Sequence, residues 1–281
     1  MASIKKTQRV TRRHFVTASP LIFAAGVLGT RSLTMAQEPP ASAGPADPKL
    51  IEDLIAANRI LYREGIVDGF GHVSVRHNRN PNRYLLSRSL APELVTAEDI
   101  IEYDLESRAV NLKGRSEYSE RFIHGEIYKA RPDVQAVVHN HSAGLIPFGV
   151  SPVPLRPIYH MGAFIGEGLS VFDIRKSAGM TDMLVSNPDR ARALATVLGM
   201  RAAVLMRGHG VTIVGSSIPI AVGRSIYLER NATLQTQAIA LGGDITYLDP
   251  AEARQIVAGG ENGGYLRAWD LWKLKAMATT K

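Results

Sequence analysis

Two histidines, one residue apart, follow an apolar run near the middle of the chain. His139 and His141 stand in VVHNH, after residues that favour a strand. Because side chains alternate between the faces of a strand, residues at i and i+2 point the same way. Imidazoles at that spacing can hold one divalent ion of the zinc, iron, manganese or cobalt type. The alternative is that two polar residues mark the place where a strand reaches the surface.

A third histidine is a further candidate ligand. His209 stands between Gly208 and Gly210, directly after the apolar run AAVLM. Glycine on both sides allows a sharp backbone turn that presents one ring. His209 could complete a three-histidine set, which leaves coordination positions open for water and substrate. The alternative is an ordinary turn histidine.

A carboxylate and a histidine lie four residues apart in a segment that predicts a helix. Glu120 and His124 would share one face of a helix over residues 117–129. Beside a metal ion, Glu120 would be a candidate for proton transfer; otherwise the pair is typical of a solvent-exposed face. The chain has no cysteine, which excludes thiolate ligands and disulfides.

The elements that must position these residues alternate between strands and helices. Such interleaving favours one α/β domain with a mixed or antiparallel sheet. Asp47 and Pro48 predict the start of the first helix. Strands are predicted at residues 72–77, 83–89, 100–105 and 134–141, with two more in 202–215; further helices are predicted at residues 117–129, 188–198, 217–241 and 249–257.

The first 36 residues predict an export signal. A basic region ends in TRRHFV, the apolar run LIFAAGVLG follows, and TMA offers small residues for cleavage after Ala36. The Arg12–Arg13 pair resembles a twin-arginine signal, which would place the mature chain in the periplasm. The alternatives are a disordered basic tail or a single membrane anchor. Residues 37–48 predict a linker, and residues 49–281 one domain.

Charge and hydropathy argue against several classes of protein. The 281-residue chain carries a formal charge of +7, but six of its basic residues and none of its acidic ones fall in the first 36 residues. The remainder is nearly neutral, which gives no case for a nucleic-acid partner. The chain has no apolar stretch of about 18 residues or more, so we expect no stable membrane span after cleavage.

Four motifs in order resemble the class II aldolase/adducin family, from about Leu50 to about Asp249. GHVSVR resembles the family's SGNxSxR strand, and YSERFIH resembles SSEWRFH with the same spacing from Glu to His. VVHNH matches the HxH metal strand, nineteen residues after Glu120 as in the fuculose phosphate aldolases, and RGHG resembles the family's NHG.

The resemblance implies a fold, a metal and a reaction. It implies a three-layer α/β/α fold in which helices flank a central mixed, largely antiparallel sheet. It implies that His139, His141 and His209 bind one divalent ion per subunit, with zinc expected first and manganese, cobalt or iron as alternatives. It implies Glu120 as the acid/base and a homotetramer with active sites between subunits. Such a site supports a carbon–carbon lyase that stabilises an enediolate.

Departures from the family's pattern bear on the substrate. The sugar-phosphate aldolases have Asn where this chain has His72, a Thr-Gly pair where it has Arg88 and Ser89, and Ser where it has Tyr118. The expected substrate contacts are His72, Arg88, Ser89, Tyr118 and Ser119. Arg88 suits a carboxylate, so we expect a small unphosphorylated hydroxy or oxo acid, cleaved by decarboxylation or by a retro-aldol step.

Alternative functions stay open at this point. The same metal site could serve an epimerase or a non-haem Fe(II) oxygenase, and the adducin branch uses the fold as a non-enzymatic interaction module. The letters HNH in residues 139–141 also spell a nuclease motif, which the near-neutral charge of the mature chain disfavours.

Overall fold

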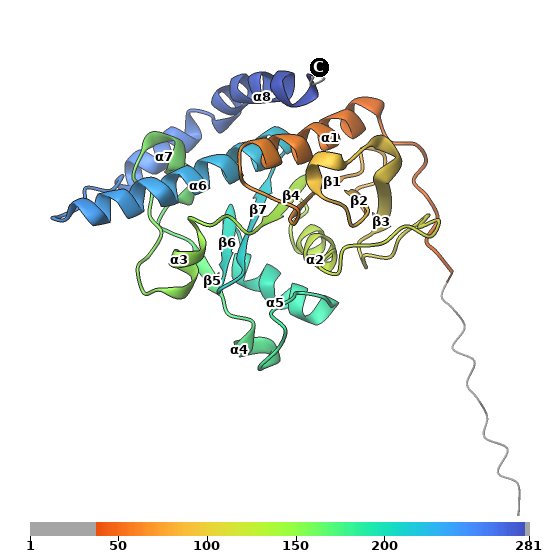
Figure 1. Cartoon of the computed structure of the whole chain (residues 1–281), viewed down its shortest axis with the longest axis horizontal. Helices are drawn as coiled ribbons and strands as arrows, with labels where there is room; N and C mark the ends of the chain where they lie inside the picture. The colour runs from red at the N-terminus through yellow and green to blue at the C-terminus, as the bar shows by residue number, and fades with distance from the viewer. Residues whose placement is uncertain (1–37, 279–281) are drawn as a thin grey trace, which may run out of the picture. The chain divides into compact units, whose positions relative to one another are not determined.

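The computed structural model describes residues 38–278, without the side chains of residues 261–264. The predicted signal at residues 1–36 therefore lies outside the described residues. Within them, helices pack on both faces of a central sheet (Figure 1). This confirms the predicted α/β fold with three layers.

A seven-stranded sheet forms the middle layer. Its spatial order is β3-β2-β1-β4-β7-β6-β5. Only β5 and β6 run parallel, and the other neighbouring strands within residues 38–278 are antiparallel. The sheet is therefore mixed and largely antiparallel, as predicted. The strands are β1 (His72–Arg76), β2 (Arg83–Ser87), β3 (Ile100–Asp104), β4 (Ala136–Asn140), β5 (Ser170–Phe172), β6 (Ala203–Met206) and β7 (Gly210–Gly215).

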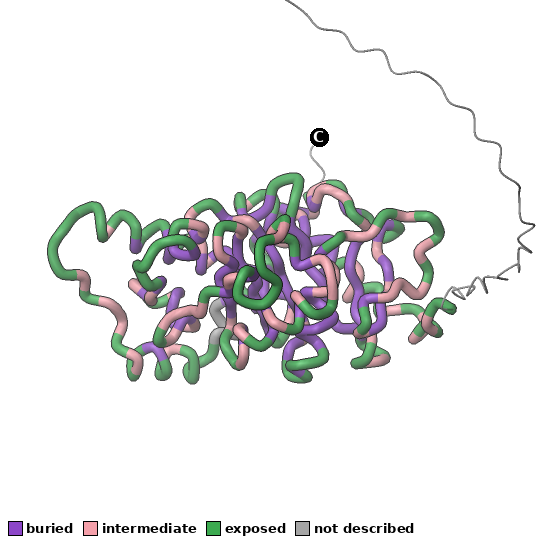
Figure 2. Tube along the Cα trace, turned by 90° about the horizontal axis from the view of Figure 1, so that it is seen from below, coloured by how far each residue is buried: buried purple, intermediate pink, exposed green. Residues whose placement is uncertain are grey.

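Helices form the two outer layers. One face of the sheet packs against α1 (Pro48–Arg63) and α6 (Ile218–Leu241), and α8 (Glu261–Met277) packs on these two helices. The other face packs against α2 (Phe122–Ala130) and α5 (Pro188–Leu198). Buried residues gather along the centre of the chain trace (Figure 2). Three other helices, α3 (Ile146–Val150), α4 (Arg175–Ala178) and α7 (Pro250–Ala258), complete the set of α-helices in the described residues.

The alternation of side chains along β4 decides where the histidines emerge. Val138 belongs to the core beneath α1 and α6, whereas Val137 belongs to the core beneath α2 and α5. Residues two apart share a face, so His139 lies on the same face as Val137. The two cores together bury the apolar residues of β1, β2, β4, β6 and β7, which fixes the register of these strands.

Side-chain caps set the helix starts that the sequence predicted. Asp47 accepts a hydrogen bond from the N–H of Lys49, and Pro48 occupies the first position of α1. Ser217 caps α6 and Asn187 caps α5 in the same way. Such a cap contributes about 1 kcal/mol to stability. Apart from the helix discussed next, the predicted elements are present, and their ends differ from prediction by at most two residues.

The helix predicted over residues 117–129 is shorter than expected, because α2 begins only at Phe122. The segment before it is held in another conformation by tertiary contacts. The N–H of Ser89 donates to the carbonyl of Ser116 (2.9 Å), and the hydroxyl of Tyr118 donates to the carbonyl of Leu90 (2.6 Å). These contacts override local helix propensity. Glu120 therefore lies in the turn before α2 and does not share a helix face with His124.

The predicted linker has no helix or strand in its described part, residues 38–47. It is nevertheless hydrogen-bonded to the domain. The N–H of Ala43 donates to Glu102 (2.8 Å), and the guanidinium of Arg83 donates to the carbonyl of Ala41 (2.9 Å). The segment thus lies along the edge of the sheet formed by β2 and β3.

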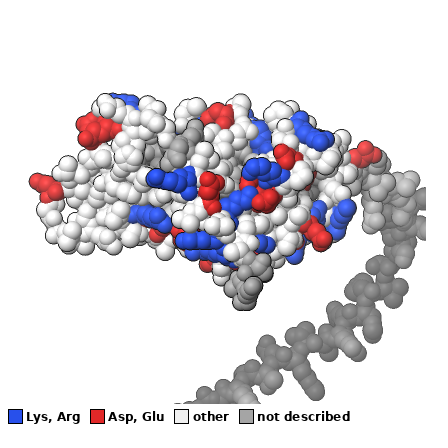
Figure 3. Space-filling model, turned by 90° about the horizontal axis from the view of Figure 1, so that it is seen from above, with Lys and Arg blue, Asp and Glu red and all other residues white. Residues whose placement is uncertain are grey.

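Membrane and surface properties complete the description. Among residues 38–278, no helix combines the length and the apolar character needed to cross a bilayer. On the face of the described residues in Figure 3, Lys and Arg side chains lie among Asp and Glu side chains.

Candidate active site

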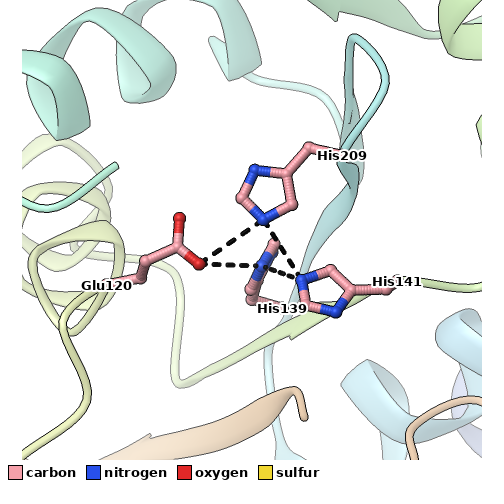
Figure 4. Close-up of side chains that lie close together, drawn as sticks. All are labelled: Glu120, His139, His141 and His209. Carbon is pink, nitrogen blue, oxygen red and sulfur yellow. Dashed lines mark hydrogen bonds and ion pairs between the residues drawn. The ribbon is translucent and has the colours of Figure 1, made fainter. Parts of the chain in front are cut away.

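Three imidazoles and one carboxylate converge beside the carboxyl end of β4 (Figure 4). His139 lies in β4, His141 directly after it, and His209 in the turn between β6 and β7. The Nε2 atom of His141 lies 3.2 Å from that of His139 and 3.1 Å from that of His209. The Oε2 atom of Glu120 lies 3.5 Å from the Nε2 atoms of both His139 and His209.

The glycines beside His209 have the role that the sequence predicted. Gly208 has a φ of 62°, in the left-handed region that favours glycine. At Gly210, an added Cβ atom would lie only 2.1 Å from the carbonyl oxygen of Asn140. The backbones of β7 and β4 therefore approach closely at this point, which brings His209 to the two histidines of β4.

The spacing of the four atoms fits a divalent ion. Ligand atoms about 2.0–2.1 Å from a tetrahedral zinc ion are separated from one another by about 3.3 Å. The contacts given above lie between 3.1 and 3.5 Å, and all four atoms lie within 4.8 Å of one another. Imidazole nitrogen and carboxylate oxygen are ordinary ligands of zinc, manganese, cobalt and iron.

Backbone carbonyls orient two of the histidines. The Nδ1 atom of His139 lies 3.1 Å from the carbonyl oxygen of Val211, and that of His209 lies 3.2 Å from the carbonyl oxygen of Met183. A carbonyl can only accept, so each Nδ1 must carry the proton. In the neutral form of each ring, the Nε2 lone pair then faces the centre, as metal ligation requires.

Glu120 is held by the same loop that orients His209. Its Oε1 atom accepts a hydrogen bond from the N–H of Val185 at 2.8 Å, which leaves Oε2 turned toward the histidines. Burial raises the pKa of Glu120, but the hydrogen bonds and charges of His139 and His209 outweigh burial and hold the pKa well below its usual range. Glu120 is therefore ionised, as a metal ligand or a base must be.

The histidines of the centre differ in their affinity for protons. Burial, together with His139 and His209, lowers the pKa of His141 to about 4. Burial by itself would lower the pKa of His209 as well, but the hydrogen bond and charge of Glu120 raise it. A metal ion therefore meets a neutral His141 and competes with a proton at His209.

A cavity of about 450 Å³ opens beside the centre. Glu120, His139 and His141 form part of its lining, so the ligand atoms are accessible from it. The remaining walls are mainly apolar or aromatic and include Phe70, Leu90, Ala91, Tyr118 and Leu184. The space suits a ring-sized substrate.

Four of the residues predicted to contact substrate line this cavity: His72, Ser89, Tyr118 and Ser119. His72 pairs directly with His139 across β1 and β4, so both rings lie on one face of the sheet. The ring of Tyr118 lies 4.6 Å from that of His72. Because its hydroxyl donates to the carbonyl of Leu90, Tyr118 contributes its ring rather than a free hydroxyl.

Arg88 is not brought to the cavity by the structure. It is not among the lining residues, and its Nε atom donates to Asp99 at 2.6 Å. Asp99 also accepts hydrogen bonds from the N–H and the hydroxyl of Thr96. The proposed grip of Arg88 on a substrate carboxylate stays a prediction without support from this geometry.

One buried polar cluster escaped the sequence analysis. His124, which we had paired with Glu120, instead points into the core, where it contacts His72 and Ser74. A signal for this existed, because the polar residues His72 and Ser74 alternate with Val73 and Val75 and therefore share one face of the strand. The helical spacing of Glu120 and His124 concealed it.

Comparisons with known proteins agree with this site. Residues 52–236 match the model of the class II aldolase and adducin N-terminal domain. The chain is 36% identical over 245 residues to the decarboxylase tropJ of Talaromyces stipitatus, covering 79% of this chain and 92% of that protein. It is 30% identical over 228 residues to a 3,4-dihydroxyphthalate decarboxylase of Arthrobacter keyseri, covering 78% and 90%.

Solved structures give the same result for the fold. An L-fuculose 1-phosphate aldolase from Glaciozyma antarctica superposes on the chain with a TM-score of 0.68 and 26% sequence identity. The superposition covers 81% of this chain and 88% of the aldolase.

Proposed function

Because the chain belongs to the class II aldolase and adducin family and is a lyase, we propose that it removes CO₂ from hydroxylated aromatic acids that carry no phosphate. The observation that carries the proposal is the composition of the cavity. Its walls are aromatic and apolar beside the four-atom centre, and none of the described residues lining it is Lys or Arg. A phosphate would find no side-chain cation there, whereas an aromatic ring would find matching walls.

The residues of the centre can perform the reaction as follows. A divalent ion held by His139, His141 and His209 supplies positive charge to substrate oxygen atoms. Glu120 is ionised and faces the same point, so it can accept the proton of a substrate hydroxyl. The carbon–carbon bond to the carboxylate then breaks, CO₂ leaves, and the electron pair stays on the substrate carbon. Glu120 returns its proton to that carbon, and solvent restores the hydroxyl proton.

The test is CO₂ release from 3,4-dihydroxyphthalate by the purified, metal-loaded protein. We expect release by the wild type and none by His139→Ala or His209→Ala, which should also lose bound metal. His160→Ala is the matched control, because His160 lies exposed on the 3₁₀ helix His160–Ile165. Full activity in either ligand variant would overturn the proposal. With a non-aromatic β-hydroxy oxo acid as substrate, release of an aldehyde would select aldol cleavage. Oxygen uptake with Fe(II) alone would select an oxygenase, and absence of stoichiometric metal would select an interaction module.

We also propose zinc as the resident metal. The set of three imidazole nitrogen atoms supports it, because three protein ligands with a fourth position left open for substrate are typical of catalytic zinc. Elemental analysis of protein purified from its native compartment tests this, and manganese, cobalt or iron in equal stoichiometry would replace zinc in the proposal.

Two further proposals concern the assembly and location of the protein. A homotetramer is supported by the family and by exposed leucines on α8, such as Leu266, Leu271 and Leu274. Sedimentation analysis that finds a monomer would contradict it. A periplasmic location is supported by the Arg12–Arg13 motif, and fractionation of cells carrying an Arg12→Lys, Arg13→Lys variant tests it.

A further inference from the structure

Four buried polar side chains form a line from the cavity into the core beneath α2. The Nδ1 atom of His72 lies 2.7 Å from the Nε2 atom of His124. The Oγ atom of Ser74 lies 2.6 Å from the Nδ1 atom of His124 and 2.8 Å from the hydroxyl of Tyr128. The hydroxyl of Tyr128 in turn lies 3.5 Å from the carbonyl oxygen of Gln135. Each of the four residues is at most 4% exposed.

The inner end of this line sets the direction of its hydrogen bonds. A carbonyl only accepts, so the hydroxyl of Tyr128 donates to Gln135 and accepts from Ser74. Ser74 then accepts from the Nδ1–H of His124, and the Nε2 atom of His124 accepts from the Nδ1–H of His72. The reverse direction would lose the bond to Gln135. The favoured direction therefore leaves the Nε2 atom of His72 without a proton.

The line orients His72 but cannot conduct a proton. It ends at the amide carbonyl of Gln135, which is not a base at neutral pH. His124 uses one ring nitrogen as a donor and the other as an acceptor, so its ring is neutral and keeps one tautomer. His72 lies in the same buried surroundings, with its Nδ1 atom committed to His124.

The outer end of the line opens on the cavity. His72 is one of the lining residues, and within residues 38–278 its Nε2 atom has no protein hydrogen-bond partner. The Nε2 atom of His72 is not one of the fully buried side-chain atoms that lack a partner, so part of its surface stays accessible from the cavity. The ring lies 5.2 Å from that of His139 and 4.6 Å from that of Tyr118. A molecule bound at the metal centre therefore lies within reach of this nitrogen.

We propose that the Tyr128–Ser74–His124 line locks His72 as a hydrogen-bond acceptor, which selects substrates with a free hydroxyl group next to the metal-bound part of the molecule. The proposal rests on the function proposed above and names its specificity-determining residue. A hydroxyl can donate to the Nε2 atom of His72. A methyl ether at the same position brings oxygen lone pairs against a nitrogen lone pair and leaves the nitrogen unpaired. The loss of such a bond lowers affinity by about 10- to 100-fold.

The experiment measures binding rather than turnover, by calorimetry on the metal-loaded enzyme. The ligands are 3,4-dihydroxybenzoate and its two mono-methyl ethers, and the readout is the ratio of the ether's Kd to that of the diol. Because methylation also weakens contact with the metal, the ratio is compared between variants. His72→Phe removes the acceptor, and Ser74→Ala breaks the line without touching the cavity. Ser225→Ala is the matched control, since Ser225 is a fully buried serine of α6 that bonds only to the carbonyl of Ala221.

For one of the two ethers, we expect the ratio of the ether's Kd to the diol's Kd to be at least about 10-fold larger in the wild type than in His72→Phe. The ratio should also fall in Ser74→Ala, because His72 is then free to take either tautomer, and should stay at the wild-type value in Ser225→Ala. Equal ratios in wild type and His72→Phe would overturn the proposal, as would tighter binding of the ether to the wild type, which would make His72 a donor. An unchanged ratio in Ser74→Ala would overturn the locking by the buried line.

Nitrogen-15 NMR of histidine-labelled protein tests the tautomer without any ligand. We expect His72 and His124 as neutral rings protonated at Nδ1, and a proton on the Nε2 atom of His72 would overturn the proposal. These readouts are independent of catalysis. A protein that discriminates hydroxyl from ether but releases no CO₂ would refute the proposed reaction and leave this inference standing.

Discussion

The close approach of β7 to β4 at Gly210 predicts the effect of a single added methyl group. In Gly210→Ala the new Cβ would lie 2.1 Å from the carbonyl oxygen of Asn140 and 3.1 Å from the Cα of His141. An ordinary contact of this kind is at least 3.4 Å, so the backbones must separate by about 1.3 Å. Metal–ligand distances tolerate only about 0.2 Å. His209, the preceding residue, therefore moves out of ligand range of His139 and His141.

The expected losses follow from that displacement. Overpacking costs about 1–3 kcal/mol of folding stability. Displacing a ligand should cost at least as much as disturbing its outer partners, which lowers metal affinity by about 10- to 100-fold, or roughly 1.4–2.7 kcal/mol. The assay is competition for the metal against a chelator of known affinity, with urea unfolding of the metal-free protein in parallel.

The control for Gly210→Ala is Gly259→Ala, at the end of α7. There an added Cβ would meet its nearest atom at 3.4 Å, an ordinary contact, and φ is −68°. We expect wild-type metal affinity from this variant. Wild-type affinity in Gly210→Ala as well would refute the argument that the approach of the two strands places His209.

Three further predictions concern the base, the buried histidine and the metal. Glu120→Gln should retain the three-histidine ligand set but lower kcat by about 10²- to 10⁴-fold; metal analysis alongside kinetics checks this, and an unchanged kcat would exclude Glu120 as the base. Because burial lowers the folded-state pKa of His124 to about 3, the stability it contributes is present above pH 6.5 and is lost as the pH falls toward 3. Between pH 6.5 and 5 the loss of stability is about 2 kcal/mol. The free energy of unfolding of His124→Gln, measured with urea, should therefore depend less steeply on pH than that of the wild type. Equal slopes in the two proteins would contradict the lowered pKa of His124. When the free metal ion is at about 100 times its Kd, its removal should lower the free energy of unfolding of the wild type by about 2.7 kcal/mol. A lower Tm in the presence of chelator would show this loss. A chelator effect of equal size in His139→Ala would contradict the ligand set.

The meeting of the three histidines could be predicted from the sequence because side chains two residues apart share a face of an extended segment. His139 in β4 and His141 directly after it keep that relation, and glycines on both sides of His209 indicated a tight turn. The structure brings all three together with Glu120. Periodicity fixes the direction of a side chain within an element, so predictions of this kind depend little on the rest of the fold.

Predictions that depended on tertiary contacts fared less well. The helix over residues 117–129 was too long, because hydrogen bonds between residues 116–118 and the 89–90 loop hold its first part in another conformation. The contact of Arg88 with substrate stays a prediction, and in the structure Asp99, eleven residues further on, engages its Nε atom. Local spacing does not reveal these contacts, because the 89–90 loop and the 3₁₀ helix Ala97–Asp99 belong to connections whose paths the sequence pattern does not determine.

Helix α8 was missed although a signal for it existed. Tyr265, Trp269, Trp272 and Ala276 recur at helical spacing, and all four are buried. The two adjacent glycines at residues 263–264 disfavour a helix by propensity. Packing of this apolar stripe against α1 and α6 overrides that propensity, which is why the pattern of large apolar residues was the better guide.

The metal centre also has a consequence for the order of folding. Its four residues come from three segments, and 89 positions separate Glu120 from His209. The centre cannot form until β4 has paired with β7 and the Met183–Val185 loop has docked on both Glu120 and His209. Such distant contacts form late in folding, because long loops must close first. Metal uptake during refolding should therefore report the completion of the whole sheet and lag behind the appearance of secondary structure.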